Sequence, residues 1–135
     1  MKCGRLIPCF FLMTLLACLA QPLSGQTPDK NREFLIEALR TGDGQAFGSY
    51  LNDLCDLELP RYKGTYSKAQ AGRIVTEFFK DHPVSSFRII REGELALKER
   101  YILSEMKSGT ATYRIYFVLK EKEGKQVIPQ VRIYQ

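Results

Sequence analysis

The sequence predicts a single α+β domain in which helices pack on one face of an antiparallel sheet. Two observations predict this class. Apolar residues recur at helical spacing between residues 29 and 83, and most of the chain after Pro83 alternates between apolar and polar residues, as half-buried strands do. The helices come before the run of strands, and such segregation along the chain is typical of α+β domains.

The N-terminus has the features of a secretory signal peptide. Lys2 and Arg5 precede the apolar run LIPCFFLMTLLACLA, and no acidic residue occurs before Asp29. The run is interrupted by Pro8 and is shorter than the ~20 apolar residues that a membrane-spanning helix needs. We therefore expect residues 1–25 to direct export and then to be removed.

Two ways of processing this segment are open. A signal peptidase could cut between residues 17 and 25, or the stretch LLAC could act as a bacterial lipobox, in which Cys18 becomes the lipid-modified first residue. In either case we expect residues 26–30 to form a short tether. Residues 31–135 then form one domain, because their number suits a single hydrophobic core.

The charge of the chain argues against a nucleic-acid partner. The full sequence has 20 basic and 15 acidic residues, and loss of Lys2 and Arg5 lowers the net charge from +5 to +3. A surplus this small and this mixed in sign does not indicate nucleic-acid binding. Contact with a membrane is expected only through the signal peptide or a lipid anchor.

Cysteine, metal and cofactor motifs give little support for catalysis. Cys55 is the only cysteine outside the signal region, and it lies in the strand-like run LCDLEL. A core position is the simpler interpretation, because the sole histidine, His82, stands before Pro83 at a helix end and is not expected to activate a thiol. No metal cluster, phosphate loop or cofactor motif is present, so we expect no metal and no cofactor.

The first two helices follow from periodicity and capping residues. Residues 29–40 carry an apolar stripe, and Gly42 is placed to end this helix. Asp43 can cap a short second helix in GQAFGSYL. The residues of the first stripe are Phe34, Leu35, Ile36 and Leu39.

A strand, a turn and a third helix are expected next. Cys55, Leu57 and Leu59 alternate with Asp56 and Glu58, which predicts a half-buried strand ending at Pro60, and RYKG reads as a turn. Ser67 and Gln70 form a capping box before a helix that ends at His82. The apolar face of this helix consists of Ile74, Val75, Phe78 and Phe79.

The remaining chain predicts three or four strands, in SFRIIREGEL, ERYILSEM, TATYRIYFVLK and QVIPQVRIYQ. Alternation assigns the odd-numbered residues to the face against the helices and the even-numbered residues to the outer face. The odd-numbered set is Phe87, Ile89, Leu95, Tyr101, Leu103, Tyr113, Ile115, Phe117, Leu119, Val127, Val131 and Ile133.

Two stretches, LPRYKGTYSKAQAGRIVTEFFKDHP and YRIYFVLKEKEGKQVIPQVRIY, resemble a family of small secreted proteins of Gram-negative bacteria that is known only as a domain of unknown function. That family is similar to the nuclear transport factor 2-like superfamily. The resemblance covers nearly the whole mature domain and implies a cone in which helices pack on a strongly curved antiparallel sheet around a pocket. It also implies the periplasm or cell envelope as location, and no established activity.

Enzymes of that superfamily, such as steroid isomerases and dehydratases, use an acid, a histidine or tyrosines inside the cone. The inward polar residues expected here are Tyr101 and Tyr113, with Glu99 at a strand start. No general base is visible in the pattern. The two tyrosines are either core rings whose hydroxyls reach the rim or contacts for a ligand.

The outer face repeats an arginine beside an apolar or aromatic residue. Three-residue hairpin loops at residues 107–109 and 122–124 would place Arg100 opposite Tyr116, Ile102 opposite Arg114, and Arg114 opposite Arg132. Two-residue loops are excluded in this interpretation, because they would pair odd with even positions. The resulting outer band is Arg100, Arg114, Tyr116, Arg132 and Tyr134.

This band is either a plain solvated face or a contact surface for a protein partner, a second copy of the chain, or an acidic glycan. The sequence therefore favours an exported, non-catalytic binding or protein-interaction domain. Its contact surface would be the cone or the outer band, and a homodimer through the outer sheet face is one option. The alternative function is a small cone-pocket enzyme of isomerase or dehydratase type.

Overall fold

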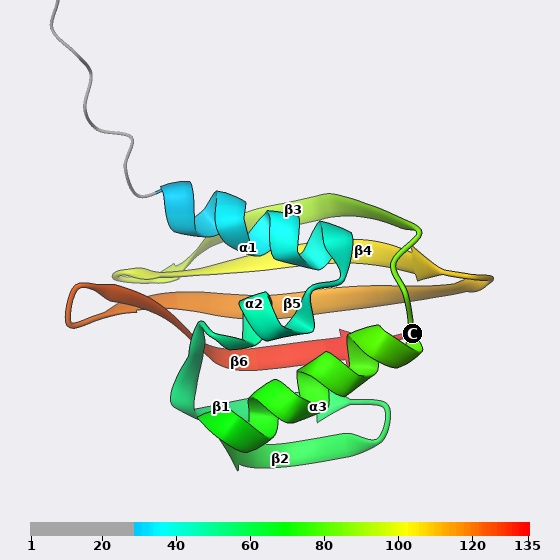
Figure 1. The fold of residues 1–135 in the computed structure, drawn as a ribbon. Coiled ribbons are helices and arrows are strands. Elements are labelled where there is room, and N and C mark those ends of the chain that lie inside the picture. The colour runs from blue at the N-terminus through cyan, green and yellow to red at the C-terminus, as the bar shows by residue number, and fades with distance from the viewer. Residues whose placement is uncertain (1–28) are drawn as a thin grey trace, which may run out of the picture.

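The computed structural model describes residues 29–135, in which three helices lie on one side of a six-stranded sheet (Figure 1). The predicted signal peptide, most of the tether and Cys18 lie outside these residues. The helices are α1 (Asp29–Thr41), α2 (Gly44–Gly48) and α3 (Lys68–Asp81). The strands are β1 (Leu51–Leu59), β2 (Tyr62–Ser67), β3 (Ser86–Ala96), β4 (Glu99–Ser108), β5 (Ala111–Lys122) and β6 (Lys125–Tyr134).

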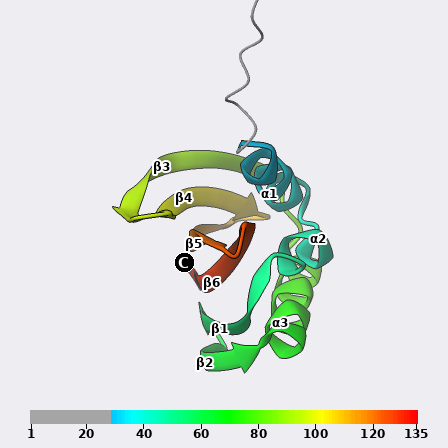
Figure 2. The ribbon, with the colours of Figure 1, turned by 90° about the vertical axis from the view of Figure 1, so that its left-hand side faces the viewer.

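The strands are arranged in the order β2-β1-β6-β5-β4-β3. Every neighbouring pair is antiparallel except β1 with β6, which run parallel and bring the N-terminal hairpin beside the C-terminal strand. The sheet bends around the helices, and none of the three described helices covers its other side (Figure 2). The predicted α+β cone, with helices on a strongly curved and mainly antiparallel sheet, is confirmed.

The helix ends follow the predicted capping residues. Gly42 ends α1 with a φ of +74°, a left-handed conformation that suits glycine. The Asp43 side chain accepts a hydrogen bond of 3.0 Å from the backbone N–H of Ala46 at the start of α2. Ser67 and Gln70 form the reciprocal capping box of α3.

One strand was not predicted. The stretch RYKG was interpreted as a turn, but only Pro60 and Arg61 form the turn, and β2 begins at Tyr62, which pairs with Leu59. The prediction was wrong because β2 is an exposed edge strand, so its sequence carries little apolar alternation. Its backbone is held by hydrogen bonds to β1, which the pattern of side chains does not show.

The core lies between the helices and the concave face of the sheet. Phe47 of α2 packs edge-on against Phe117 of β5, with ring centroids 5.2 Å apart, and both side chains are at most 1% exposed. The predicted apolar face of α3 is buried in full. In α1, however, Phe34 is 48% exposed and Ala38 takes a core position instead.

Strand β4 faces the opposite way from the prediction. Ile102, Ser104 and Met106 are fully buried against the helices, so the odd-numbered residues of β4 lie on the outer face. The cause is the β4–β5 turn, which contains two residues, because Ser108 pairs with Ala111. Gly109 has a φ of +59°, which fits the first central position of a type II′ turn.

A bulge in β6 restores the predicted pairing of odd-numbered with odd-numbered residues between β5 and β6. These strands are also joined by two residues, since Lys122 pairs with Lys125, but the register shifts before Val118 pairs with Gln130. The extra residue lies at Ile128–Pro129, and a bulge is one of the few places where a central strand accepts proline. On the turn side of the bulge Ile128 is buried rather than the predicted Val127.

Strand β3 carries two further register shifts, at Ile90 and at Leu95. Bulges bend a strand and increase its twist, which is consistent with the long arc of β3 in Figure 2, from beside α1 to the β3–β4 turn on the side away from the helices. After them Leu95, predicted to face the core, is 50% exposed. Periodicity alone cannot follow a strand through two bulges.

An ion pair joins the first helix to the edge of the sheet. Arg32 of α1 donates two hydrogen bonds to the carboxylate of Glu92 in β3, at 2.8 and 2.6 Å. Hydrogen-bond donation from Arg32 is the main cause that holds the pKa of Glu92 below its ordinary value; burial opposes it, and the charges of Arg32 and Arg100 add smaller lowering contributions. The pair fixes α1 against the bent part of β3.

We expect Gly44→Ala to destabilise the domain by about 2 kcal/mol, because the new Cβ would lie 2.7 Å from the Thr76 Cα, where α2 touches α3. Gly72→Ala in α3 is the matched control. A Cβ there meets no atom within 4 Å, so alanine should stabilise the helix by about 0.5–1 kcal/mol. Urea unfolding of both variants measures this, and equal effects would contradict the close approach of the helices.

We expect Glu92→Gln to lower the free energy of unfolding by about 1 kcal/mol at pH 7, since the pair is partly exposed to solvent. A lowered pKa in the folded state means that the stabilisation is present above the ordinary value of 4.5 and is lost as the pH falls through the lowered pKa. The difference between wild type and variant should therefore shrink below pH 4.5. A constant difference down to pH 2.5 would contradict the ion pair.

Candidate functional site

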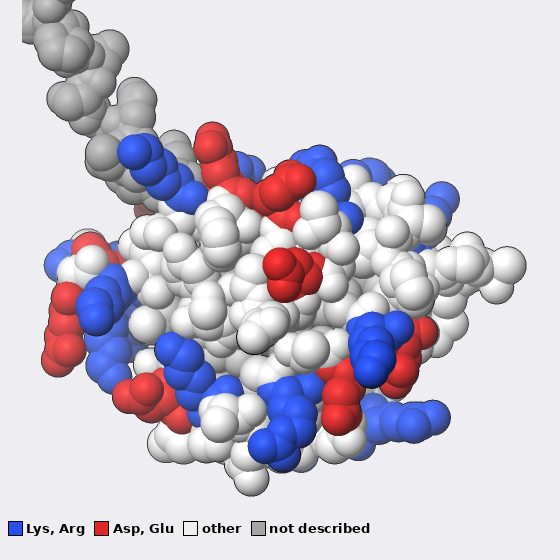
Figure 3. Space-filling view, viewed as in Figure 1, with Lys and Arg blue, Asp and Glu red and all other residues white. Residues whose placement is uncertain are grey.

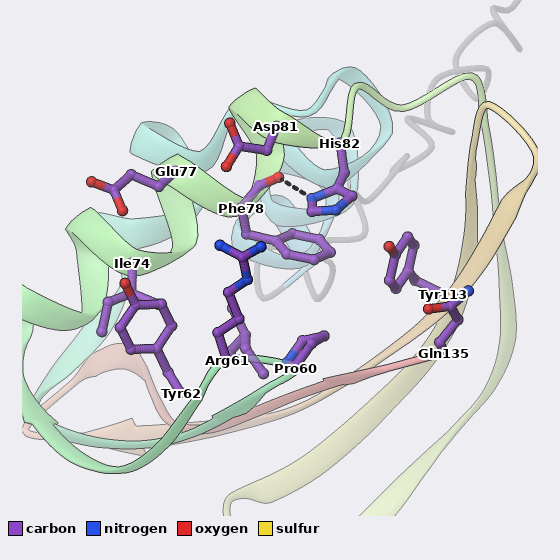
Figure 4. A pocket seen from close by; sticks show the side chains of 11 residues that line it. Pro60, Arg61, Tyr62, Ile74, Glu77, Phe78, Asp81, His82, Tyr113 and Gln135 are labelled. Atoms are coloured by element: carbon purple, nitrogen blue, oxygen red, sulfur yellow. Dashed lines mark hydrogen bonds between the residues drawn. The ribbon is translucent and has the colours of Figure 1, made fainter.

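A pocket of about 400 Å³ opens where the end of α3 faces the β1–β2 turn and strands β5 and β6 (Figure 4). Its lining comes from parts of the chain that are far apart in sequence. Helix α3 supplies Ile74, Glu77, Phe78 and Asp81, with His82 directly after it. The other side consists of Leu59, Pro60, Arg61, Tyr62, Tyr113 and Gln135.

The floor of the pocket is aromatic and buried. Phe78 and Tyr113 are each 7% exposed, and their rings meet edge-on with centroids 5.3 Å apart. Leu59 and Ile74 are also buried. Tyr113 therefore occupies the inward position that the sequence predicted, at the rim of the filled core.

His82 completes the aromatic group in a defined orientation. Its ring stacks on Phe78 with centroids 4.5 Å apart and meets Tyr113 edge-on at 5.1 Å. The Nδ1 atom lies 2.9 Å from the carbonyl oxygen of Phe78. A carbonyl only accepts, so Nδ1 carries the proton, and Nε2 is left without a hydrogen bond among the described residues.

Charges of both signs surround the mouth of the pocket. Glu77 and Asp81 lie four residues apart and so share one side of α3. Arg61 extends from the β1–β2 turn into the space between α3 and Tyr113 (Figure 4). Within residues 29–135, no ion pair joins Arg61 to either carboxylate.

Sequence reasoning missed most of this pocket. His82 was interpreted as a helix end and nothing more, and Arg61 was placed in a turn. The sequence did contain an indication that Phe78 and His82 lie together, because residues four apart in a helix meet on one face. That the β1–β2 turn and Tyr113 close over this face could not be read from spacing, since both are distant in the chain.

The interior of the cone behind the pocket is filled. Phe117 is fully buried, Phe79 is 4% exposed, and Phe47 occupies the space between α2 and the sheet. A nuclear transport factor 2-like cone implies an interior cavity, but here side chains fill the interior, and the pocket at the end of α3 lies at the opening of the cone. Within the described residues, there is also no group of three side chains that could hold a metal ion.

The outer sheet face is the side of the sheet away from the helices, and three cross-strand rows form its central part. The first row is Arg88, Glu105, Arg114 and Tyr134. The second is Arg91, Leu103, Tyr116, Arg132, Glu58 and Lys63. The third is Gly93, Tyr101, Val118, Gln130, Asp56 and Thr65.

Four of the predicted band residues lie on this face, but their pairing differs from the prediction. Arg114 lies opposite Tyr134, and Tyr116 lies opposite Arg132, so the expected Arg114–Arg132 pair was wrong. The two-residue β5–β6 turn and the bulge in β6 each shift the register by one residue, so the partner of Arg114 lies two residues beyond the predicted one. No like-charged pair of arginines therefore exists in these rows.

Tyr101 and Arg100 lie on opposite sides from those predicted, because the even-numbered residues of β4, not the odd-numbered ones, face the helices. The ring of Tyr101 lies on the outer face over Gly93 and stacks on Tyr116 with centroids 5.9 Å apart. Tyr101 is therefore not a hydroxyl donor inside the cone. Arg100 lies opposite Leu119 on the concave side, which excludes its predicted contact with Tyr116.

The family model that matches this sequence is described as Domain of unknown function (DUF4783), and it covers residues 33–134. The chain belongs to the DUF4783 family. A solved DUF4783 structure from Bacteroides uniformis is 25% identical, with a TM-score of 0.70, over 76% of this chain and 94% of that one. A second, from Bacteroides ovatus, is 23% identical, with a TM-score of 0.68, over 74% and 90%.

Solved structures outside the DUF4783 family share the fold of this domain. An NTF2-like protein of unknown function from Cytophaga hutchinsonii is 14% identical, with a TM-score of 0.54, over 83% of this chain and 93% of that one. At such identity the likeness shows the fold alone, which is the cone that the sequence implied. No curated protein matches the chain. Among the described residues, no helix has the length and apolar character to span a membrane.

Cys55 of the DUF4783 domain is a core residue, as predicted. Its side chain is fully buried. Burial, assisted by the neighbouring charge of Asp56, raises the pKa of the thiol from 9.0 to about 12. A thiol that stays protonated at neutral pH is a poor nucleophile, so Cys55 does not carry chemistry in the folded state.

We expect iodoacetamide to leave Cys55 unmodified in the native protein at pH 8 and to modify it fully in 6 M guanidinium chloride. The protonated, buried thiol is both inaccessible and unreactive. Peptide mass spectrometry measures the reaction at this cysteine alone. Modification in minutes under native conditions would contradict the core position.

Proposed function

We propose that this chain is an exported, non-catalytic binding domain, and that the pocket at the end of α3 binds a small zwitterion with a flat apolar side chain. An aromatic amino acid or a short peptide has this chemistry. One observation carries the proposal: the pocket combines a buried aromatic floor with charges of both signs at its mouth that form no ion pair within residues 29–135. Its volume of about 400 Å³ is in the range of small-molecule sites.

The floor selects for an apolar ring. Phe78, His82 and Tyr113 already contact one another edge-on or stacked, which are the arrangements that aromatic pairs prefer. A ligand ring placed on this group would extend it and remove apolar surface from water. Such burial contributes roughly 25 cal/mol per Å² before the cost of association is subtracted.

The mouth selects for two charges. A carboxylate near Arg61 would form a charge-assisted hydrogen bond, and a guanidinium can make it bidentate. An ammonium near Glu77 and Asp81 would balance two carboxylates that have no cationic partner among the described residues. A purely anionic ligand would be repelled by those carboxylates, which is why a zwitterion fits better.

The proposed export of the protein is consistent with a role in binding small ligands. The proposal of export rests on the sequence of residues 1–25, which lie outside the described structure. We propose the cell envelope as the site of action, with Cys18 as a lipid anchor in the lipobox alternative. A binding domain in that compartment would meet free amino acids and peptide fragments.

We expect phenylalanine to bind the wild-type protein and to shift the NMR resonances of Tyr113 and His82. Arg61→Ala should weaken binding about fivefold, equivalent to about 1 kcal/mol for an ion pair open to solvent. Lys63→Ala, on the same hairpin but facing outward opposite Glu58, should leave the affinity unchanged. Isothermal titration calorimetry measures all three dissociation constants.

Two analogues of phenylalanine, each lacking one of its two charges, test the roles of Arg61 and Asp81 separately. N-acetylphenylalanine lacks the cation, so its binding should weaken in Arg61→Ala and strengthen in Asp81→Asn, which removes a repelling carboxylate. Phenylalaninamide lacks the anion, so its binding should weaken in Asp81→Asn and should not weaken in Arg61→Ala, which removes a repelling cation. Failure of all three compounds to shift the Tyr113 or His82 resonances at millimolar concentration would contradict the proposed ligand class.

The alternative function is a cone-pocket enzyme of isomerase or dehydratase type, and one observation favours it. His82 has a fixed tautomer whose Nε2 can accept a proton, and its ring lies beside Tyr113 in the same pocket. Such an enzyme would convert a molecule that binds the pocket, whereas a binding domain would not. Conversion followed by NMR, and lost in His82→Gln while binding persists, would favour this alternative.

A further inference from the structure

The outer sheet face carries a surplus of positive charge that is separate from the pocket. Its three rows hold five basic and three acidic side chains. The basic residues are Arg88, Arg91, Arg114, Arg132 and Lys63. The acidic residues are Glu105, Glu58 and Asp56.

The acidic side chains on this face are already engaged by neighbours. Arg88 donates to Glu105 at 3.1 Å, Arg132 lies 3.7 Å from Glu58, and Thr65 donates to Asp56 at 2.6 Å. By contrast, Arg91 and Arg114 are exposed and form no ion pair within the described residues. The surplus therefore consists of guanidinium groups that are available to an external anion.

Two of the arginines are held in place before any partner arrives. With its amide oxygen turned toward Arg132, Gln130 accepts from Nε and Nη2 of that residue, both at 3.1 Å. Arg88 is held by Glu105 across the strands. A guanidinium that is already oriented loses less conformational entropy on binding than a free lysine would.

Aromatic rings lie among the arginines. Tyr101 covers Gly93 and stacks on Tyr116, and Tyr134 is 46% exposed opposite Arg114. Tyrosine and arginine are the residue types enriched at protein–protein contacts and at their energetic centres. Helices α1, α2 and α3 all lie on the opposite side of the sheet, as Figure 2 shows.

We propose that the outer sheet face binds an acidic segment of a partner protein. The surplus charge of Arg91 and Arg114 supplies the complementarity, and an exposed guanidinium can match a carboxylate in bidentate geometry. A second copy of the chain is a poorer occupant, because a two-fold interface would set this positive face against itself. The helix side offers no acidic patch either, since its charges alternate in sign around a mainly uncharged centre (Figure 3).

The test measures binding of a fluorescein-labelled peptide of twelve residues, rich in Asp and Glu, to the purified protein by fluorescence anisotropy. We expect binding that weakens with added salt, because exposed charges are screened. The double variant Arg114→Glu/Arg132→Glu should bind at least tenfold more weakly. Arg114→Gln/Arg132→Gln should lie between, and it keeps the test decisive if charge reversal disturbs the fold.

The matched control is Arg73→Glu/Lys80→Glu, which changes the net charge equally but on the exposed side of α3. It should leave peptide binding within twofold of wild type. Equal loss in both double variants, or no binding of the peptide at low salt, would overturn the proposal. So would preferential, Arg114-dependent binding to phosphatidylglycerol vesicles or to a sulfated glycan, or self-association in sedimentation that is lost in the outer-face variant.

Discussion

The structure depends on one constraint: a single layer of helices must cover one face of a sheet that curls around it. Each strand can contribute to the core only where its apolar side chains point to the concave side. Strands β3 and β6 carry bulges, at Ile90, Leu95 and Ile128–Pro129. Each bulge bends the strand and also reverses which residues face the core, so curvature and side-chain orientation are set together.

The same packing decides where a ligand site can exist. Phe47, Phe79 and Phe117 fill the space under the sheet, so the cone has no deep interior cavity. At the end of α3, where the β1–β2 turn faces the helix, Phe78 and Tyr113 line an opening. The pocket is thus a consequence of how far the core extends, and its charged mouth lies where the elements end and solvent begins.

The convex side follows from the other half of each strand. Because the helices occupy one face only, the alternate residues of every strand collect on a continuous outer surface. The two-residue turn at Gly109 moves Tyr101 to that surface and Arg100 away from it. The ordered arginines and stacked tyrosines are therefore arranged by strand register, and their availability is a result of one-sided helix packing.

The sequence by itself determined the fold class, the helix caps at Gly42, Asp43 and Ser67, and the buried face of α3, because these depend on residues close together in the chain. It also placed Arg114, Tyr116, Arg132 and Tyr134 on the outer face. Only the tertiary structure decided which residues of β4 face the core and that β2 is an edge strand. It also decided that Arg61, His82 and Tyr113 lie in one pocket. Those features depend on turn length, bulges and contacts between distant segments, and a single strand's periodicity carries no information about its neighbours.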